Sequence, residues 1–294
     1  MSDAYIVGVG MIRFGKFADE TVRTMAEKAI RLALEDAGSA TKDLQAAFFS
    51  NTFWGMFNSQ HSIRGQVVLR GMGIDKIPVT NVENACAGAS TALHLAYMGI
   101  RADMFDVALA IGSEKISSPN KAMSLGAYAA CMDMENLQSH IQMIMEMGKS
   151  FKVEVPSDES VPGQGRSIFM DAYAMGARWH MDRFGSTQRQ LAVISSKNHL
   201  HGSLNPLSQY QNPMSVEEVL ADKPVAYPLT RAMCAPVGDG AAAAVVCSER
   251  FLKRVGRRRA VKILASVLGQ GSDRDLDGPD IGERLSRQAY EVAG

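Results

Sequence analysis

Cys86 stands in a run of small residues, NACAGAS, where an extended segment is expected to give way to a helix. A thiolate is a strong nucleophile, but a free cysteine is only slightly ionised at neutral pH. A helix start favours the thiolate through its unpaired backbone N–H groups and the positive end of its dipole, and the same groups can hold an oxyanion. The residues alone leave two interpretations open: an accessible nucleophile, or a small buried hydrophobic side chain, as most free cysteines are.

Three histidines are the next candidates for chemistry. His94 lies about two helical turns after Cys86 and is expected to be a packed or surface residue rather than the base for the thiol. His199 and His201 are expected on one face of an extended segment, a spacing that could hold a metal. No carboxylate or cysteine accompanies them in a ligand pattern, so we predict no metal site.

The four cysteines are widely spaced and include no Cys-x-x-Cys pair; they are Cys86, Cys131, Cys234 and Cys247. This spacing favours neither a zinc site nor a small disulfide scaffold, and it fits a reducing compartment. The sequence has no run of about 18 uncharged apolar residues and no secretory signal pattern. We therefore expect a cytoplasmic protein without a membrane span.

The charges of the chain are balanced, with 31 lysine and arginine residues against 31 aspartate and glutamate residues. No net field therefore draws the chain to nucleic acid or to an anionic membrane. The basic run Lys253–Lys262 has no interleaved aromatic residues and is interpreted as a solvated link. We predict no nucleic-acid partner.

Short apolar strands alternate with amphipathic helices over the first part of the chain. Expected strands lie within residues 4–15, 44–53, 77–85 and 107–117, a further strand is expected at 241–247, and expected helices lie within 19–40, 63–74 and 86–106. This alternation predicts an α/β fold with a mostly parallel sheet and helices on its faces, and it places Cys86 at a strand-to-helix junction.

Two further features concern the organisation of the chain. Between about Ser117 and Met233 the periodicity is broken and prolines are frequent, which indicates an excursion from the sheet framework. Residues 5–15 and 27–38 also match residues 261–271 and 283–294 at one constant offset. The match predicts that a second copy of the domain begins near Ala260, and that the chain stops after one strand and one helix of it.

Three segments in order resemble the thiolase family. NVENACAGASTALHLAYMGIRADMFDVALAIGSEKIS, from Asn81, resembles the nucleophile segment, with GSEK as its glycine–glutamate turn. SKNHLHGSLNPLSQYQNPMSVEEVL, from Ser196, resembles the subgroup typified by the thiolase part of sterol carrier protein x. CAPVGDGAAAAVVCSE, from Cys234, resembles the strand that closes the N-terminal domain. The resemblance covers the whole chain and favours the nucleophile interpretation of Cys86.

The resemblance implies a thiolase-like fold, a layered αβα domain with a mixed, mostly parallel sheet. Residues 1–117 and 234–259 would form the N-terminal thiolase domain, residues 118–233 an inserted loop domain, and residues 260–294 the beginning of a C-terminal domain. It also implies a homodimer that pairs through the strand before the cysteine, IPVTNVEN.

The resemblance further implies an acyltransferase that moves an acyl group between coenzyme A and a carbon nucleophile through an acyl-cysteine at Cys86. Coenzyme A and acyl-CoA are then substrates, and no tightly bound cofactor is expected. By matching position, Met175, Ala235 and Pro236 are candidates to line the acyl-CoA pocket, while their alternative roles as core or turn residues stay open.

The family's catalytic histidines and second cysteine belong to its second half, which we expect beyond Gly294. The chain alone should therefore show little thiolysis, because a missing acid or base typically costs about 10² to 10⁴ in rate. The alternative is a non-catalytic thiolase-like protein that binds or transfers lipid or acyl-CoA, with a partner chain.

Overall fold

The computed structural model describes residues 2–156, 163, 165–256 and 259–294. The chain folds into two compact units: the first contains residues 1–12, 17–115 and 239–294, and the second contains residues 13–16 and 116–238. The predicted assignment of residues 118–233 to a loop domain and of residues 260–294 to a second thiolase domain stays a prediction.

The first unit is built on a sheet of strand order β3-β2-β4-β7-β1-β8. Its strands are β1 (Ala4–Met11), β2 (Ala46–Ser50), β3 (Val79–Val82), β4 (Val107–Glu114), β7 (Gly240–Ser248) and β8 (Val261–Lys262). Strand β2 pairs in parallel with β3 and β4, whereas β7 is antiparallel to both β4 and β1, and β8 is antiparallel to β1. Four strands therefore share one direction, and the mixed, mostly parallel α/β sheet is confirmed.

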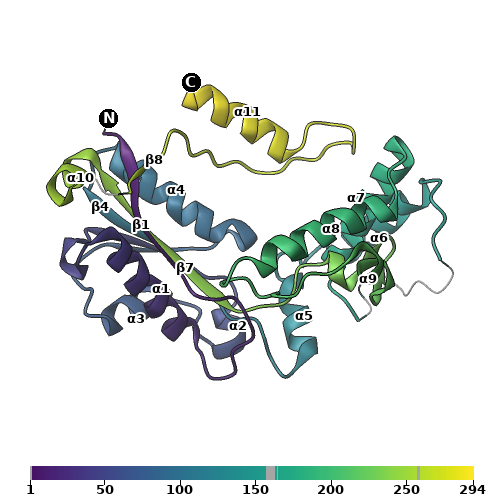
Figure 1. Cartoon of the computed structure of the whole chain (residues 1–294), viewed down its shortest axis with the longest axis horizontal. Helices are drawn as coiled ribbons and strands as arrows, with labels where there is room; N and C mark the ends of the chain where they lie inside the picture. Colours follow the sequence, from purple (N-terminus) through teal and green to yellow (C-terminus); the bar gives the residue numbers. More distant parts are fainter. Residues whose placement is uncertain (1, 157–162, 164, 257–258) are drawn as a thin grey trace. The chain divides into compact units, whose positions relative to one another are not determined.

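Helices cover both faces of this sheet (Figure 1). The helices of the first unit are α1 (Val22–Ala37), α2 (Trp54–Asn58), α3 (Arg64–Gly71), α4 (Gly88–Arg101), α10 (Glu249–Val255) and α11 (Ile281–Ala293), of which α11 does not pack on the sheet. Helices α1, α3 and α10 pack on one face, and α4 packs on the other. The sheet is thus the middle layer of an αβα sandwich.

The two faces follow from the period of two along each strand. On β4, Leu109 and Ile111 face the α1 side, whereas Ala108 and Ala110 face α4. Small residues on the α4 side let this helix lie close to the sheet, which brings its first turn against the ends of β2 and β4. The packing of α4 on the sheet therefore fixes the position of Cys86, which lies directly before this helix.

The C-terminal part of the first unit differs from the predicted repeat. A strand was expected within Val261–Gly271, but β8 spans only Val261–Lys262 and adds to the edge of the first sheet through β1. The segment after it crosses α4 (Figure 1). The expected helix is present as α11, which has no buried residue. Arg257 and Arg258, within the basic run, lie outside the described residues.

The second unit is mostly helical, which corrects the expectation of only broken helical periodicity. Its elements are α5 (Lys121–Ala129), α6 (Leu137–Lys149), α7 (Ile168–Phe184), α8 (Gln188–Ser203), α9 (Val216–Ala221), β5 (Pro224–Ala226) and β6 (Leu229–Thr230). Large apolar side chains such as Tyr173, Ile194 and Leu200 are exposed on α7 and α8, so the apolar residues of these helices do not form a clean stripe. None of the helices in the described ranges has the length and apolar run that crossing a bilayer requires.

Candidate active site

Cys86 lies on a tight turn between β3 and α4. The chain leaves β3 at Val82, forms one 3-10 turn over Ala85–Ala87, and enters α4 at Gly88. Cys86 is exposed, and in the part of the chain that the structure describes its Sγ makes no hydrogen bond. The expected strand-to-helix junction is confirmed, and the thiol projects from it into open space.

The residue before the cysteine has an unusual backbone conformation. Ala85 has φ of 43°, in the left-handed region that a residue with a Cβ rarely adopts. Such a conformation costs about 1–2 kcal/mol and persists only where its surroundings hold it. A sharp strand-to-helix turn of this kind lifts the next side chain clear of the backbone, as at the nucleophile elbow of other folds.

Polar contacts hold this turn on both sides of Ala85. The backbone N–H of Ala85 donates to Glu83 Oε1 at 2.6 Å, and Thr52 Oγ1 donates to the Ala85 carbonyl oxygen at 3.4 Å. The side chain of Asn84 donates to Thr91 Oγ1 at 2.9 Å, which ties the turn to the first part of α4. The strained residue is therefore fixed by the strand loop before it and by the helix after it.

Close packing places the first turn of α4 against the sheet. A Cβ on Gly88 would collide with Ser50 Oγ at the end of β2. A Cβ on Gly112 of β4 would meet the Cβ of Ala89 at 2.6 Å. Both glycines are therefore required by the close approach of α4 to these two strands, and this approach sets the position of Cys86.

A partly buried carboxylate fixes the loop next to this turn. Glu114, at the end of β4, accepts hydrogen bonds from Asn51 Nδ2 at 2.9 Å, from Thr52 N at 2.8 Å and from Phe53 N at 3.2 Å. Burial raises the pKa of the Glu114 carboxyl, while these backbone donors and the charge of Arg64 act in the opposite direction. This glutamate belongs to the GSEK turn singled out in the sequence.

The other cysteines of the chain differ from Cys86 in their surroundings. Cys234 is partly buried and Cys247 is buried. Burial raises the pKa of the Cys234 thiol, and burial together with the charge of Asp106 raises the pKa of Cys247 to about 12. Both are therefore held as neutral thiols at pH 7, in a form that is a poor nucleophile.

His94 lies on α4, in the same unit as Cys86. Its ring is partly buried, and Nδ1 is hydrogen-bonded with Ser266 Oγ at 2.9 Å. The expectation of a packed histidine is confirmed, because this contact holds the ring against the segment that follows β8.

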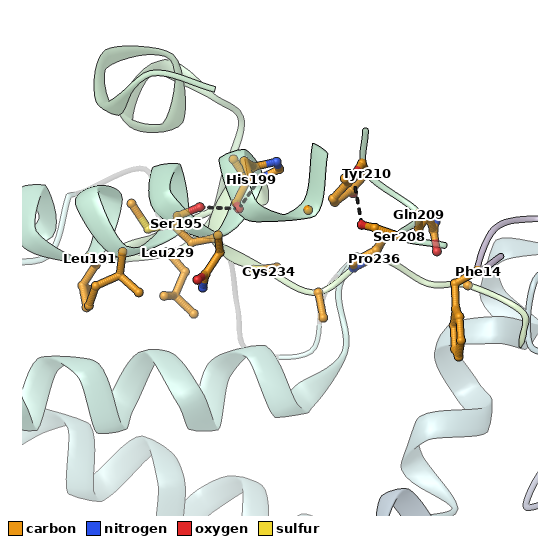
Figure 2. A pocket seen from close by; sticks show the side chains of 17 residues that line it. Phe14, Leu191, Ser195, His199, Ser208, Gln209, Tyr210, Leu229, Cys234 and Pro236 are labelled. Carbon is orange, nitrogen blue, oxygen red and sulfur yellow. Dashed lines mark hydrogen bonds between the residues drawn. The ribbon is translucent and has the colours of Figure 1, made fainter. Parts of the chain in front are cut away.

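The second unit contains a cavity of about 710 Å³ (Figure 2). Its lining includes Ala235 and Pro236, two of the residues expected to line an acyl-CoA pocket. Apolar side chains dominate the wall; they are Phe14, Leu191, Ile194, Leu229, Met233 and Tyr210. No lysine or arginine lines the cavity, so it offers an uncharged surface suited to an apolar group.

His199 and His201 do not lie on the extended segment that was expected, and the role of Met175 in an acyl-CoA pocket stays a prediction. Met175 is buried on α7 and does not line this cavity. His199 and His201 are on helix α8, not on an extended segment, so they point to different faces. The His199 ring stacks on Tyr210 with centroids 5.3 Å apart, and its Nε2 donates to the Ala232 carbonyl oxygen at 3.1 Å.

Among the residues that the structure describes, no group of three or more histidine, cysteine, aspartate or glutamate side chains could hold a metal ion.

The family of the chain is decided by comparison with known proteins. The model of the thiolase N-terminal domain matches residues 4–215. The chain belongs to the thiolase family. The matched residues include Cys86 and its turn, and they also include α7 with Met175.

The relatives include proteins named as a thiolase subunit, as an acetyl-CoA acetyltransferase and as sterol carrier protein 2. The chain is 32% identical to benzoylsuccinyl-CoA thiolase subunit BbsB of Thauera aromatica, over 99% of this chain and 68% of that protein. It is 30% identical to acetyl-CoA acetyltransferase of Methanothermobacter thermautotrophicus, over 100% of this chain and 70% of that protein. Human sterol carrier protein 2 is 31% identical, over 99% of this chain, and the chain spans 51% of its length.

Solved structures show the same fold. A structure titled Ltp2-ChsH2(DUF35) aldolase matches with a TM-score of 0.62 and 20% identity, over 86% of this chain and 57% of that chain. A monomeric SCP2-thiolase-like protein type 1 from Mycobacterium smegmatis matches with a TM-score of 0.58 and 17% identity, over 86% of this chain and 47% of that chain. These likenesses confirm the thiolase-like fold of the chain.

Sequence reasoning did not find the residues that hold the thiolase cysteine turn. Thr52 and Glu83 make contacts around Ala85, and Asn51 lies buried beneath them. The run SNT at residues 50–52, near the end of the strand expected within 44–53, was a usable signal, because polar residues at the end of a parallel strand gather at the edge where ligands bind. The left-handed conformation of Ala85 has no signal in the sequence, because glycine or asparagine is the usual residue there.

Proposed function

We propose that the protein is a thiolase-type acyl-CoA C-acyltransferase in which Cys86 carries the acyl group. The observation that carries the proposal is the exposed thiol on the fixed turn before α4, in a chain that belongs to the thiolase family. An exposed cysteine on a strained backbone contributes little to packing, and strain of this kind is concentrated at functional sites.

The proposed chemistry has two halves. The Cys86 thiolate attacks the acyl carbonyl carbon, a carbon–sulfur bond to the enzyme forms, and the bond to coenzyme A breaks, so that coenzyme A leaves as a thiolate and takes up a proton. The acyl group then passes to a carbanion of a second acyl-CoA, forming a carbon–carbon bond and restoring the Cys86 thiolate. Thiolysis is the reverse sequence, and both directions give ping-pong kinetics.

We assign acyl-CoA binding to residues of the second unit as part of this proposal. Ala235 and Pro236 line its cavity, whose apolar wall suits an uncharged acyl chain or the pantetheine arm. Met175, buried on α7, remains a proposed contributor to acyl-CoA binding on the ground of its matching position in the family alone. Residues 118–233 would then be the loop domain of a thiolase, and residues 260–294 the start of its C-terminal domain.

Partners and compartment are proposed on separate grounds. Strand β3 is at the edge of the sheet and exposes Thr80 and Asn81, so it can pair with the same strand of a second copy in a homodimer. One relative is named as a thiolase subunit, and the name of one structural neighbour, Ltp2-ChsH2(DUF35) aldolase, has two components. Both names support a partner chain as well. The four free cysteines fit the reducing cytoplasm.

The proposal is tested by isotope exchange in the natural full-length protein. Exchange of labelled coenzyme A into unlabelled acyl-CoA requires only the first half-reaction. We expect exchange in the wild-type protein and its loss in Cys86→Ser, with Cys247→Ala, at a buried cysteine of β7 that does not line the cavity, as the control that keeps exchange. Exchange of equal rate in Cys86→Ser would contradict the proposal.

A second function is favoured by the sterol carrier protein relatives and by the apolar cavity. The protein would bind or transfer lipid or acyl-CoA without turnover. Saturable acyl-CoA binding that persists in Cys86→Ser, together with no exchange in the wild-type protein, would favour this function over the first.

A further inference from the structure

The end of strand β2 forms the support of the cysteine turn. Ser50 is the last residue of β2, and its Oγ occupies the space that a side chain on Gly88 would need. Two residues later, Thr52 Oγ1 lies 3.4 Å from both the Ala85 carbonyl oxygen and Glu83 Oε1. Residues on both sides of Cys86 therefore rest on the segment 50–52.

This support is itself fixed from beneath by strand β4. Glu114 accepts hydrogen bonds from the backbone of Thr52 and Phe53, and Asn51 Nδ2 donates both to Glu114 and to the Ser113 carbonyl oxygen. Asn51 is 3% exposed. A buried and fully hydrogen-bonded network of this kind specifies one geometry, because any other arrangement leaves buried donors without partners.

A carboxylate is a costly group for a purely structural contact. Desolvation of Glu114 opposes its charge, whereas an apolar core would be built from side chains that pay no such penalty. Ala85 adds a second cost, because its left-handed backbone must be held by its neighbours. Both costs fall on the few residues that set the position of one exposed thiol.

We propose that Thr52 and Glu114 are positioning residues for Cys86: Glu114 fixes the loop 51–53, and the Thr52 hydroxyl holds the strained Ala85 peptide that orients the thiol. The inference rests on the proposed function only for its effect on turnover. The effect on the reactivity of Cys86 stands independently of any acyl transfer.

Variants of Thr52 give the sharpest test. Thr52→Val removes the hydroxyl at nearly constant volume, and Thr52→Ser restores it. In the full-length protein, we expect Thr52→Val to lower kcat for acyl transfer by about tenfold with KM within about twofold, because misplaced reacting groups lose rate rather than affinity. Thr52→Ser should recover kcat to within about twofold of wild type.

A second measurement does not depend on enzymatic turnover. Peptide-resolved alkylation by iodoacetamide reports the reactivity of Cys86 directly, and we expect its rate to change by at least about threefold in Thr52→Val and in Glu114→Gln. The control is Ser248→Ala, which removes a buried hydroxyl that caps α10 elsewhere in the first unit. It should lower thermal stability and leave the Cys86 rate unchanged.

The outcomes separate the two proposals. Unchanged Cys86 alkylation and unchanged kcat in folded Thr52→Val and Glu114→Gln proteins would overturn the positioning role. Altered alkylation in these variants, in a protein whose wild type shows no coenzyme A exchange, would support the positioning role and reject the acyltransferase. If Thr52→Val does not fold, the alkylation rate of Glu114→Gln decides.

Discussion

At the scale of single residues, the proposed chemistry depends on the contrast between one exposed thiol and two thiols whose pKa is raised by burial. Cys86 is exposed on a held, strained turn, whereas burial keeps Cys234 and Cys247 protonated. The small neighbours of Cys86 and its resemblance to the family motif predict that it is a nucleophile, and this role stays a prediction. It could not predict the support at Thr52, because the contact joins residues about thirty positions apart that only the sheet brings together.

Glu114 gives a pH dependence of stability whose sign follows from its burial. Its folded pKa is raised above the ordinary value of 4.5, so the folded state holds the proton more tightly than the unfolded state. The stabilising contribution is complete below pH 4.5 and is lost as the pH rises through the folded pKa. Arg64 and the amides of Thr52, Phe53 and Lys115 face the carboxyl and reduce the shift.

Urea unfolding at a series of pH values measures this contribution. The difference in unfolding free energy between the wild type and Glu114→Gln should fall as the pH rises above 4.5, because only the wild type loses a proton there. Aspartates and glutamates elsewhere titrate in both proteins and cancel in the difference. A difference that rises with pH would show that the folded pKa is lowered, against this account.

At the scale of elements, the approach of α4 to β2 and β4 determines where the cysteine turn lies. The sequence predicted these elements because β2 and β4 are short apolar runs buried on both faces, and α4 buries one apolar face. Helices α7 and α8 were not predicted, because apolar residues such as Ile194 and Leu200 are exposed on them and blur the 3.6-residue period. Within the strand expected at Val261–Gly271, the structure has only the short strand β8. Its two residues, Val261 and Lys262, pair with Ile6 and Tyr5 of β1.

Substitution of Gly88 tests the packing of α4. Gly88→Ala introduces a Cβ that collides with Ser50 Oγ, so either the Ser50 hydroxyl rotates away from its place at the turn or the first turn of α4 shifts. We expect a loss of about 1–3 kcal/mol in unfolding free energy and a slower Cys86 alkylation. Gly126→Ala on α5 is the matched control, because no atom lies within 4 Å of its new Cβ. It should be neutral or stabilise by up to about 1 kcal/mol, and equal effects of the two variants would contradict the packing argument.

At the scale of the whole molecule, the chain passes between its two units at four places, after Ile12, Lys16, Lys115 and Gly238. Residues of the first unit next to these passages contact one another. Asp239 Oδ2 accepts from Phe17 N at 3.0 Å, and the Lys115 ammonium donates to the Phe17 carbonyl and lies 3.5 Å from Asp239. The charge composition of the sequence could not predict these contacts, because the residues that form them are far apart in the chain.

This ion pair should matter to stability far more than a surface pair. Asp239 is fully buried and Lys115 is 20% exposed. Lys115→Met removes one charged partner of a buried carboxylate, and we expect a loss of about 3 kcal/mol in unfolding free energy. Lys149→Met breaks the exposed pair with Glu146 and should cost less than about 1 kcal/mol. Equal midpoints for the two variants in urea unfolding would contradict this ranking.

The central claim is that Cys86 accepts the acyl group, and mass spectrometry of the full-length protein after incubation with an acyl-CoA tests it most directly. We predict a mass increase equal to one acyl group, located on the peptide that contains Cys86, removed by hydroxylamine and absent in Cys86→Ser. Turnover of the acyl-CoA with Cys86 unmodified, or acylation that persists in Cys86→Ser, would contradict the account.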